Sequence, residues 1–432
     1  MVEAEESYDV IIIGGGIAGL SCAVSLLRHF ATGPSGPVSI ALVEWQERLG
    51  GRLYSCKVGD VEADAGAAWV HGVDGNPLIE DGWIGPEDLV PSSAQNIWLH
   101  GPAETDSCSF KASEEDETWE RRLAVVGAAA SMAQGGRSLQ DGLLETEPIM
   151  GPLAHAERRR LRMLEGWFGM SADRIGLLEW DGEHGSMGDY PGAHAVLKGG
   201  MRILVERLAN EAQRLGLKVV LGQEVCAVEE VRDEVRIHCH QRCFRAQWAV
   251  VTVSLGVLQS RPSFLQLPEK PLQRLEMCHY NKLLLNVSES AAARFPVFTD
   301  LVSHHFWQLF NYWPLTGKPL LSLATLSAEA EKLTDEEALE AACGLLTLAK
   351  HEIRASHFTR WGRVPWACGS YSVSSKDAEW DDIRALLLAT EEGRIKVAGE
   401  HTHEEHQGGF HAAYLSGKRA AQEVWEGFQA VA

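Results

Sequence analysis

The stretch "YDVIIIGGGIAGLSCAVSLLRHF", residues 8–30, decides the fold. Its β-branched run at 10–13 predicts a strand, and the apolar-periodic segment that reaches about residue 30 predicts a helix. Between them Gly14, Gly16 and Gly19 stand in G-x-G-x-x-G spacing. The first glycine makes the turn, the second lets a pyrophosphate approach, and the third lets the helix pack on the sheet. A structural glycine turn is the alternative, but strand, turn and helix in this order predict a dinucleotide site.

A second strand follows, and it ends on an acid. Residues 31–37 are rich in Gly and Pro and predict a loop, and "VSIALVE" at 38–44 predicts the next strand of the βαβ unit. Glu44 stands where a carboxylate can accept hydrogen bonds from both hydroxyls of an adenosine ribose. Because an acid here disfavours a 2′-phosphate, the residues favour FAD or NAD over NADP.

Length and charge narrow the class of protein. The chain has 432 residues, which predicts two or more domains, and a net charge of −21 from 60 acidic against 39 basic residues. This balance excludes nucleic acid as a partner and suits a cationic ligand, although solubility alone explains it equally well. No apolar run reaches the roughly 18 residues of a membrane helix. Nine irregularly spaced cysteines predict a reduced intracellular compartment, and the absence of a signal peptide or peroxisomal signal favours the cytoplasm. We also expect a monomer.

The residues after Glu44 carry a resemblance. Glu44, Arg48, Gly50, Gly51 and Arg52 form E-x-x-x-R-x-G-G-R, which resembles the FAD-dependent amine oxidase family of monoamine oxidases, polyamine oxidases and flavin-type histone demethylases. "DAGAAWVHG" at 64–72 and "KGGMRILVERLA" at 198–209 resemble further family segments. "IKVAGEHTHEEHQGGFHAAYLSGKRAAQEVW" at 395–425 resembles the closing signature, A-G-E-x-T followed by a helix. The match is closest to the polyamine oxidase branch.

The resemblance implies FAD as the cofactor and a set of residues around it. Arg52 is expected at the pyrophosphate and ribose, Val225 at the adenine through its backbone, and Glu400 beside the pyrophosphate and ribityl chain. Phe410 is expected to offer its N–H to the flavin at a helix N-terminus. Ser370 replaces the cysteine that tethers the flavin in monoamine oxidases, so we expect FAD to be held without a covalent bond. The complete expected set is Gly14, Gly16, Ala18, Gly19, Glu44, Arg52, Gly66, Ala67, Ala68, Trp69, Val225, Trp361, Gly399, Glu400 and Phe410.

The same resemblance implies the substrate residues. Lys282 in "YNKLLLNV" resembles the family lysine that holds a water against flavin N5, whereas a lysine on a strand is otherwise a solvated edge residue. Tyr371 is expected to form one wall of an aromatic box around the amine, and Gly409 leaves the opposite wall open. His71 is expected to face the substrate, with a structural donor as the alternative. Asp189 is expected to pair with a distal ammonium, although a helix-capping or loop acid is as plausible.

The expected fold is α/β. A doubly wound, Rossmann-like FAD-binding domain comprises 1–78, 194–282 and 369–432, and an inserted α+β substrate-binding domain comprises 79–193 and 283–368. Within them we expect strands at 223–230 and 248–258, acidic loop at 111–122 and helix at 335–353. Neither "HCHQRC" at 238–243 nor "HTHEEH" at 401–406 has the ligand spacing of a zinc site, so no metal is expected.

The implied activity is oxidation of a secondary amine of a polyamine, such as spermine, spermidine or an acetylated form. Hydride transfer to FAD and reoxidation by dioxygen would give an amine, an aldehyde and hydrogen peroxide. One alternative is a flavin oxidase of monoamines or amino acids, although no arginine clamp for a carboxylate is evident. Another is a redox-silent flavoprotein that binds a partner. Histone demethylation is disfavoured because no long antiparallel helical insert is evident in the sequence.

Overall fold

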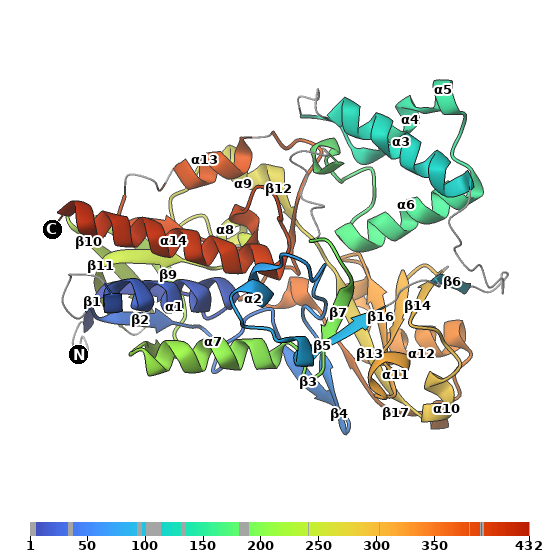
Figure 1. Ribbon diagram of the computed structural model, residues 1–432, viewed down its shortest axis with the longest axis horizontal. Coiled ribbons are helices and arrows are strands. Elements are labelled where there is room, and N and C mark those ends of the chain that lie inside the picture. Colours follow the sequence, from blue (N-terminus) through green and yellow to red (C-terminus); the bar gives the residue numbers. More distant parts are fainter. Residues whose placement is uncertain are drawn as a thin grey trace.

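The computed structural model places two sheets side by side, with a group of helices beyond them (Figure 1). It describes residues 6–32, 38–92, 97–100, 114–130, 135–180, 190–240, 242–301, 303–379, 381–388, 390 and 393–431. Among these residues no helix is long and apolar enough to cross a membrane.

The first sheet has seven strands in the order β8-β2-β1-β11-β10-β9, and β19 pairs with the end of β11. Strands β8, β2, β1, β11 and β19 run parallel, which the predicted βαβ unit requires. Helices α1, α7 and α14 cover one face (Figure 1). The strands come from three separate stretches of chain, because β1 and β2 lie near the start, β8–β11 in the middle and β19 near the end.

The elements of this first part have the following bounds: β1 Glu6–Ile13, α1 Ile17–Thr32, β2 Ile40–Val43, α7 Arg202–Arg214, β8 Lys218–Val220, β9 Val225–Val231, β10 Glu234–Cys239, β11 Cys243–Val251, α8 Leu255–Ser260, α9 Glu269–Arg274, α13 Asp382–Leu388, β19 Ile395–Val397, the 3₁₀ turn η6 Glu400–Thr402 and α14 Phe410–Val431.

The second sheet has six strands in the order β17-β13-β16-β15-β14-β6, and all pairs are antiparallel except β14 with β6. Helix α12 packs its alanine-rich face on this sheet. Helices α3, α4 and α6 form a separate cluster with their own apolar core (Figure 1). Sheet and helices together are the α+β part that the sequence predicts, so the fold class is confirmed.

The bounds in the second sheet and the helical cluster are β6 Ile97–His100, α3 Glu114–Ala130, α4 Leu139–Glu145, α5 Glu147–Met150, α6 His155–Phe168, η2 Leu177–Trp180, β13 Asn281–Val287, α10 Glu289–Ala292, β14 Phe298–Leu301, β15 Gln308–Asn311, α11 Trp313–Thr316, β16 Leu320–Thr325, η3 Ala330–Lys332, α12 Asp335–Leu346, η4 Lys350–Glu352 and β17 Ile353–Phe358. Between the two sheets lie β3 Ser55–Val58, β4 Val61–Asp64, α2 Pro77–Glu80, η1 Pro86–Asp88, β5 Leu89–Ser92, β7 His194–Leu197, β12 Leu275–Met277, η5 Trp361–Arg363 and β18 Ser372–Ser374.

Three local predictions were wrong. From residue 114 the acidic segment is helix α3 rather than loop, because Trp119, Leu123 and Val126 recur at helical spacing and are buried. The strand expected over 248–258 ends at residue 251, since the Ser254 side chain accepts a hydrogen bond from the Val257 N–H and caps helix α8. The helix expected over 335–353 ends at residue 346, because Thr347 adopts a left-handed conformation with φ of 51°.

The expected domain boundaries cut through paired strands. The boundary after residue 282 falls inside β13, whose first residues Asn281 and Lys282 already pair with β16 in the second sheet. Strand β5, assigned to the substrate part, pairs with β7, assigned to the cofactor part. Lys282 therefore belongs to the second sheet, and its side chain reaches toward the first part of the chain.

Candidate active site

The glycine turn between β1 and α1 combines two packing constraints with an open space. A Cβ on Gly14 would lie 2.6 Å from the Thr252 Oγ1, and one on Gly19 would lie 2.0 Å from the Gly14 carbonyl oxygen. A Cβ on Gly16 would meet nothing within 4 Å. Gly14 and Gly19 therefore serve the turn and its packing, whereas Gly16 borders open space at the α1 N-terminus. This arrangement fits a phosphate group.

Glu44 follows β2 directly and is 6% exposed. Its carboxylate accepts hydrogen bonds from the Gly15 N–H at 2.6 Å and the Gln46 N–H at 2.8 Å. The carboxylate is thus held beside the glycine turn, and its remaining lone pairs fit ribose hydroxyls. Val225 begins β9, two residues after Gln223, whose N–H donates to the Glu44 carbonyl oxygen at 2.9 Å. The two expected adenosine contacts therefore lie near each other.

The Gly-Gly-Arg segment crosses the glycine turn and then runs beside residues 65–68. The Gly50 N–H donates to the Gly15 carbonyl at 2.8 Å, and the Ala67 N–H donates to the Arg52 carbonyl at 3.2 Å. A Cβ on Gly66 would lie 1.8 Å from that Arg52 oxygen, so only glycine allows this approach. Ala68 is buried next to Ala67. The small residues of "DAGAAWVHG" thus permit close passage of the chain.

Arg52 and Glu400 form a partly buried ion pair that joins the two ends of the chain. The Arg52 Nη1 lies 2.8 Å from the Glu400 Oε1 and also donates to the Ser370 carbonyl at 2.9 Å. The other Glu400 oxygen accepts from the Ser372 hydroxyl at 2.5 Å and the Gly408 N–H at 3.0 Å. Burial alone would raise the pKa of Glu400, but the Arg52 charge and these hydrogen bonds hold it below its usual value. Part of the Arg52 charge is therefore already neutralised within the protein.

The remaining expected cofactor residues lie around this ion pair. Gly399 precedes Glu400 with φ of 146° and donates its N–H to the Ser416 Oγ at 2.9 Å. Phe410 is the first residue of α14, as expected. Trp361 is buried and donates its Nε1–H to the Ala65 carbonyl at 3.3 Å. Ala18 lies in the first turn of α1, with its carbonyl against Gly417 of α14.

Lys282 is the buried cation of the site. It lies on β13, is 8% exposed, and its Nζ donates to the carbonyl oxygens of Asp64 at 3.1 Å and Gly66 at 2.5 Å. Burial lowers its pKa to about 8, although the negative charge of Asp64 opposes the shift. A solvated edge lysine would show neither the burial nor the two carbonyl partners. The ammonium lies on the same backbone segment that the resemblance assigns to the flavin.

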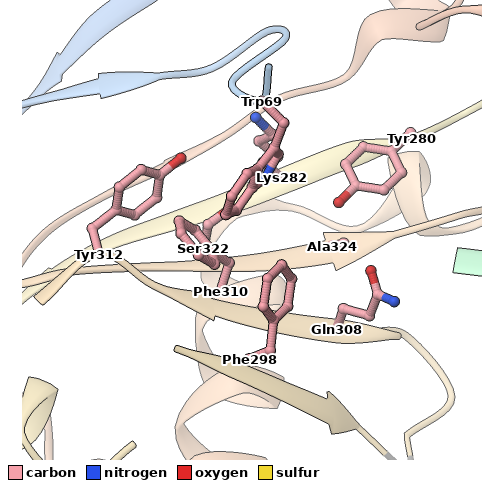
Figure 2. A pocket seen from close by; sticks show the side chains of 9 residues that line it. All are labelled: Trp69, Tyr280, Lys282, Phe298, Gln308, Phe310, Tyr312, Ser322 and Ala324. Carbon is pink, nitrogen blue, oxygen red and sulfur yellow. The ribbon is translucent and has the colours of Figure 1, made fainter. Parts of the chain in front are cut away.

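An aromatic cavity opens beside Lys282 (Figure 2). Trp69 stacks on Phe298 with ring centroids 5.4 Å apart and meets Phe310 edge-on at 4.4 Å. Figure 2 shows Tyr280 and Tyr312 on opposite sides of Lys282. The residues that line the cavity are Trp69, Tyr280, Lys282, Phe298, Gln308, Phe310, Tyr312, Ser322 and Ala324.

Tyr371 stands next to this cavity. Its ring centroid lies 6.0 Å from that of Tyr280, and burial raises the pKa values of both phenols, that of Tyr280 to about 12. A Cβ on Gly408 would lie 3.4 Å from the Tyr371 ring. Gly409 follows and has no side chain toward the site. Tyr371, the expected wall of the aromatic box, and Gly409, the expected open position, therefore lie near each other.

His71 is exposed and makes an edge-to-face ring contact with His194 at 5.4 Å. Its neighbour Val70 forms a bridge with Ala195, which brings the two histidines together. His71 therefore lies two residues beyond Trp69 and away from the lining of the aromatic cavity. Asp189 lies outside the described residues.

Most of the residues that line the aromatic cavity were not predicted from the sequence. Tyr280 could have been found, because it stands two residues before Lys282 and alternate residues of an extended segment share a face. Phe298, Phe310 and Tyr312 carried no comparable signal, since their meeting depends on the pairing of β14, β15 and β16.

The histidine-rich motifs do not form a metal centre. His238 of β10 pairs with Cys243 of β11 in an antiparallel arrangement. In the described part of the chain no group of three or more His, Cys, Asp or Glu side chains could hold a metal ion.

Comparisons with known proteins agree with this geometry. The family model of the flavin-containing amine oxidoreductases matches residues 153–425, and an NAD(P)-binding Rossmann-like domain matches residues 12–83. Polyamine oxidase 3 of Oryza sativa subsp. japonica is 26% identical over 96% of this chain and 88% of its own length. Lysine-specific histone demethylase 1 homolog 1 of Arabidopsis thaliana is also 26% identical, over 97% of this chain but 52% of its own length.

The solved structures include wild-type putrescine oxidase bound to putrescine. It matches with a TM-score of 0.76 at 17% identity, over 98% of this chain and 99% of that one. This likeness supports the fold, and the family model identifies FAD as the cofactor. Because the family model covers more than half of the sequence, the chain belongs to the flavin-containing amine oxidoreductases.

Proposed function

We propose that this protein oxidises a secondary amine of a polyamine and releases an amine, an aldehyde and hydrogen peroxide. The observation that carries the proposal is the aromatic cavity beside Lys282 (Figure 2), which has neither an arginine nor a carboxylate among its described lining residues. Aromatic faces suit an alkyl chain and attract an ammonium group. A charged amine loses hydration there, so the pocket favours the neutral amine that the reaction needs.

The FAD site would be made by residues from both ends of the chain. The Gly16 turn and the α1 N-terminus would take the pyrophosphate, Glu44 the ribose, and the Phe410 N–H the flavin ring. Arg52 and Glu400 would order the chain between them. When bound, FAD supplies the two-electron oxidation of the carbon beside the amine nitrogen and passes the electrons to dioxygen.

The protein's own side chains would orient the substrate and hold a proton. Trp69, Tyr280 and Tyr371 would confine the amine, and Lys282 would hold a proton at Nζ next to the Gly66 carbonyl. With a pKa of about 8, this ammonium can release or regain its proton near neutral pH. Hydrolysis of the oxidised amine by water then gives the aldehyde and the shorter amine. His71 and Asp189 remain predictions as substrate residues.

The cavity lining also bears on the alternatives. An amino-acid substrate would need a cation for its carboxylate, and Lys282 is engaged with two backbone carbonyls. A monoamine would fit the same aromatic walls, so it remains the second candidate. Burying a lysine costs free energy of desolvation, and a redox-silent flavoprotein would gain no function from it. Oligomeric state and compartment remain predictions.

A substrate panel with product identification tests the proposal. Purified FAD-loaded protein is mixed with spermine, spermidine, their N-acetyl forms, a monoamine and an amino acid under air. We expect hydrogen peroxide and an aldehyde from at least one polyamine. Turnover of the monoamine or amino acid alone would contradict the polyamine assignment.

A further inference from the structure

A second cluster of rings lies beyond Gly409, outside the aromatic cavity. Tyr190 lies with its ring centroid 4.9 Å from that of His406 and 5.3 Å from that of His411, and the two imidazoles are 5.1 Å apart. The three rings come from the segment before β7, the loop before α14 and the first turn of α14. We call Tyr190, His406 and His411 the imidazole–phenol cluster.

The cluster contains two imidazole nitrogens without a hydrogen-bond partner among the described residues. His411 is 4% exposed, yet its Nδ1 has no hydrogen-bond partner among the described residues, and the same holds for the buried Nδ1 of His406. A buried polar atom without a partner is costly, so such atoms commonly mark a position that a ligand completes. By contrast, the neighbouring His403 Nδ1 accepts the N–H groups of Glu405 and His406, both at 3.3 Å.

The His411 ring is uncharged at neutral pH. Burial, together with the charges of the neighbouring His406, His71 and His403, lowers the pKa of His411 to about 3. His411 is therefore neutral at any pH at which the enzyme would work. Burial raises the pKa of Tyr190, and the negative charges of Glu405 and Glu80 act in the same direction. The environment thus favours a cation over an anion.

Gly409 connects the cluster to the amine site. A Cβ on Gly408 would face the Tyr371 ring at 3.4 Å, whereas one on Gly409 would lie 2.6 Å from the His411 ring. A side chain at position 409 would therefore collide with the His411 ring. Because residue 409 is glycine, only backbone lies between His411 and Tyr371. The glycine that leaves the expected aromatic box open is thus the residue against which the His411 ring packs.

We propose that the imidazole–phenol cluster binds the second, non-reacting ammonium group of the substrate. This inference rests on the proposed function. The Nδ1 atoms of His411 and His406 accept N–H bonds from the ammonium, and the Tyr190 ring faces its charge. Recognition by neutral acceptors selects a free amino group at this end of the substrate over an apolar end.

Two amines that differ by one group test the inference. N-Propyl-1,4-diaminobutane and N-propylbutylamine share the same secondary amine and chain, but only the first has a terminal amino group. The dissociation constant of each is measured with FAD-loaded protein by anaerobic stopped-flow, from the dependence of flavin reduction on amine concentration. His411→Phe should reduce the preference for the diamine about tenfold, the scale of a hydrogen bond to a charged group.

Matched variants distinguish a binding role from a structural one. His411→Asn keeps an acceptor and should retain much of the preference, whereas His406→Phe should lose part of it. The remote, exposed His240→Phe is the control and should keep the wild-type ratio. If the ratio of the two dissociation constants is unchanged in both His411→Phe and His406→Phe, the inference is overturned. If the His411 variant loses FAD, the result for His406→Phe is used instead. If neither amine reduces the flavin, the proposed function fails, and the ratio is read instead from the absorbance shift on binding.

Discussion

Lys282 shows how a single residue ties the two sheets together. Its backbone pairs in the second sheet, while its ammonium reaches the carbonyls of Asp64, the last residue of β4, and of Gly66 just after it. Its strand is held in place by Thr359, whose hydroxyl accepts the Lys282 N–H at 2.8 Å and whose own N–H donates to the Lys282 carbonyl at 3.0 Å. A buried lysine so firmly positioned is a candidate for chemistry.

Replacement of Lys282 by Met should leave the fold and FAD intact but slow flavin reduction or reoxidation at least tenfold, within the range of proton-transfer groups. Because the pKa of Lys282 is about 8, its ammonium is present below that pH and lost above it. The ratio of wild-type to variant rate should therefore fall as the pH rises through 8. Stopped-flow measurements of both half-reactions from pH 6 to 10 check this. Equal rates in the two proteins would remove Lys282 from the mechanism.

Glu44 is the second residue whose replacement is informative. Glu44→Ala should weaken FAD binding by roughly 2–3 kcal/mol, the scale of hydrogen bonds to a charged group. The variant also loses the acceptor of the Gly15 and Gln46 N–H groups, so thermal unfolding of the FAD-free proteins serves as the control. Full retention of flavin after dilution would count against the ribose assignment.

At the scale of elements, substitutions at two glycines of the turn between β1 and α1 distinguish an effect on folding from an effect on cofactor binding. Gly19→Ala places a Cβ 2.0 Å from a backbone oxygen and should destabilise the fold. Gly16→Ala meets no protein atom within 4 Å and should fold normally, but its methyl group would occupy the space assigned to the pyrophosphate. Circular-dichroism melting and FAD content measured on both variants check this. If Gly16→Ala retains as much FAD as wild type, the assignment of this space to the pyrophosphate is wrong.

The segment before β18 determines how the flavin is held. Residues 368–370 are not extended, because Cys368 has φ of 51°, and its thiol lies near the Ser260 hydroxyl and the Pro365 carbonyl. The Ser370 hydroxyl instead donates to the Cys278 carbonyl at 2.7 Å and accepts the Tyr280 N–H at 2.9 Å. These contacts do not orient the Cys368 thiol or the Ser370 hydroxyl toward a covalent bond with the flavin.

We therefore expect FAD to be bound without a covalent bond. After precipitation of the protein with acid, the yellow colour should pass into the supernatant. Trypsin digestion of the pellet, followed by mass spectrometry, serves as the control for a flavin-modified peptide. Colour that stays with the pellet would show that a tether exists.

Local elements were predictable from the sequence, and distant pairings were not. The β1–turn–α1 unit and the strand before Glu44 depend on neighbours in the chain, so their patterns sufficed. Helix α3 was missed because its acidic start obscured the apolar stripe of Trp119, Leu123 and Val126. The walls at Phe298, Phe310 and Tyr312 depend on register within the second sheet, which no local pattern specifies.

At the scale of the whole molecule, the chain returns to the glycine turn from its far end. Helix α14 packs along α1, and the Ser21 hydroxyl donates to the Tyr414 carbonyl at 2.7 Å. The Arg52–Glu400 pair likewise joins residues 348 positions apart in the sequence. The cofactor site therefore forms only when both ends of the chain are folded, while the second sheet supplies Lys282 and the aromatic cavity. The net charge of −21 favours the approach of a cationic substrate to this site.

Anaerobic mixing of the FAD-loaded protein with spermine tests the central claim most directly. If the protein oxidises polyamines, the visible absorbance of the oxidised flavin should bleach within seconds and return when air is admitted, with hydrogen peroxide formed. A flavin that stays yellow with spermine, spermidine and their acetylated forms, in protein that retains bound FAD, would contradict the account.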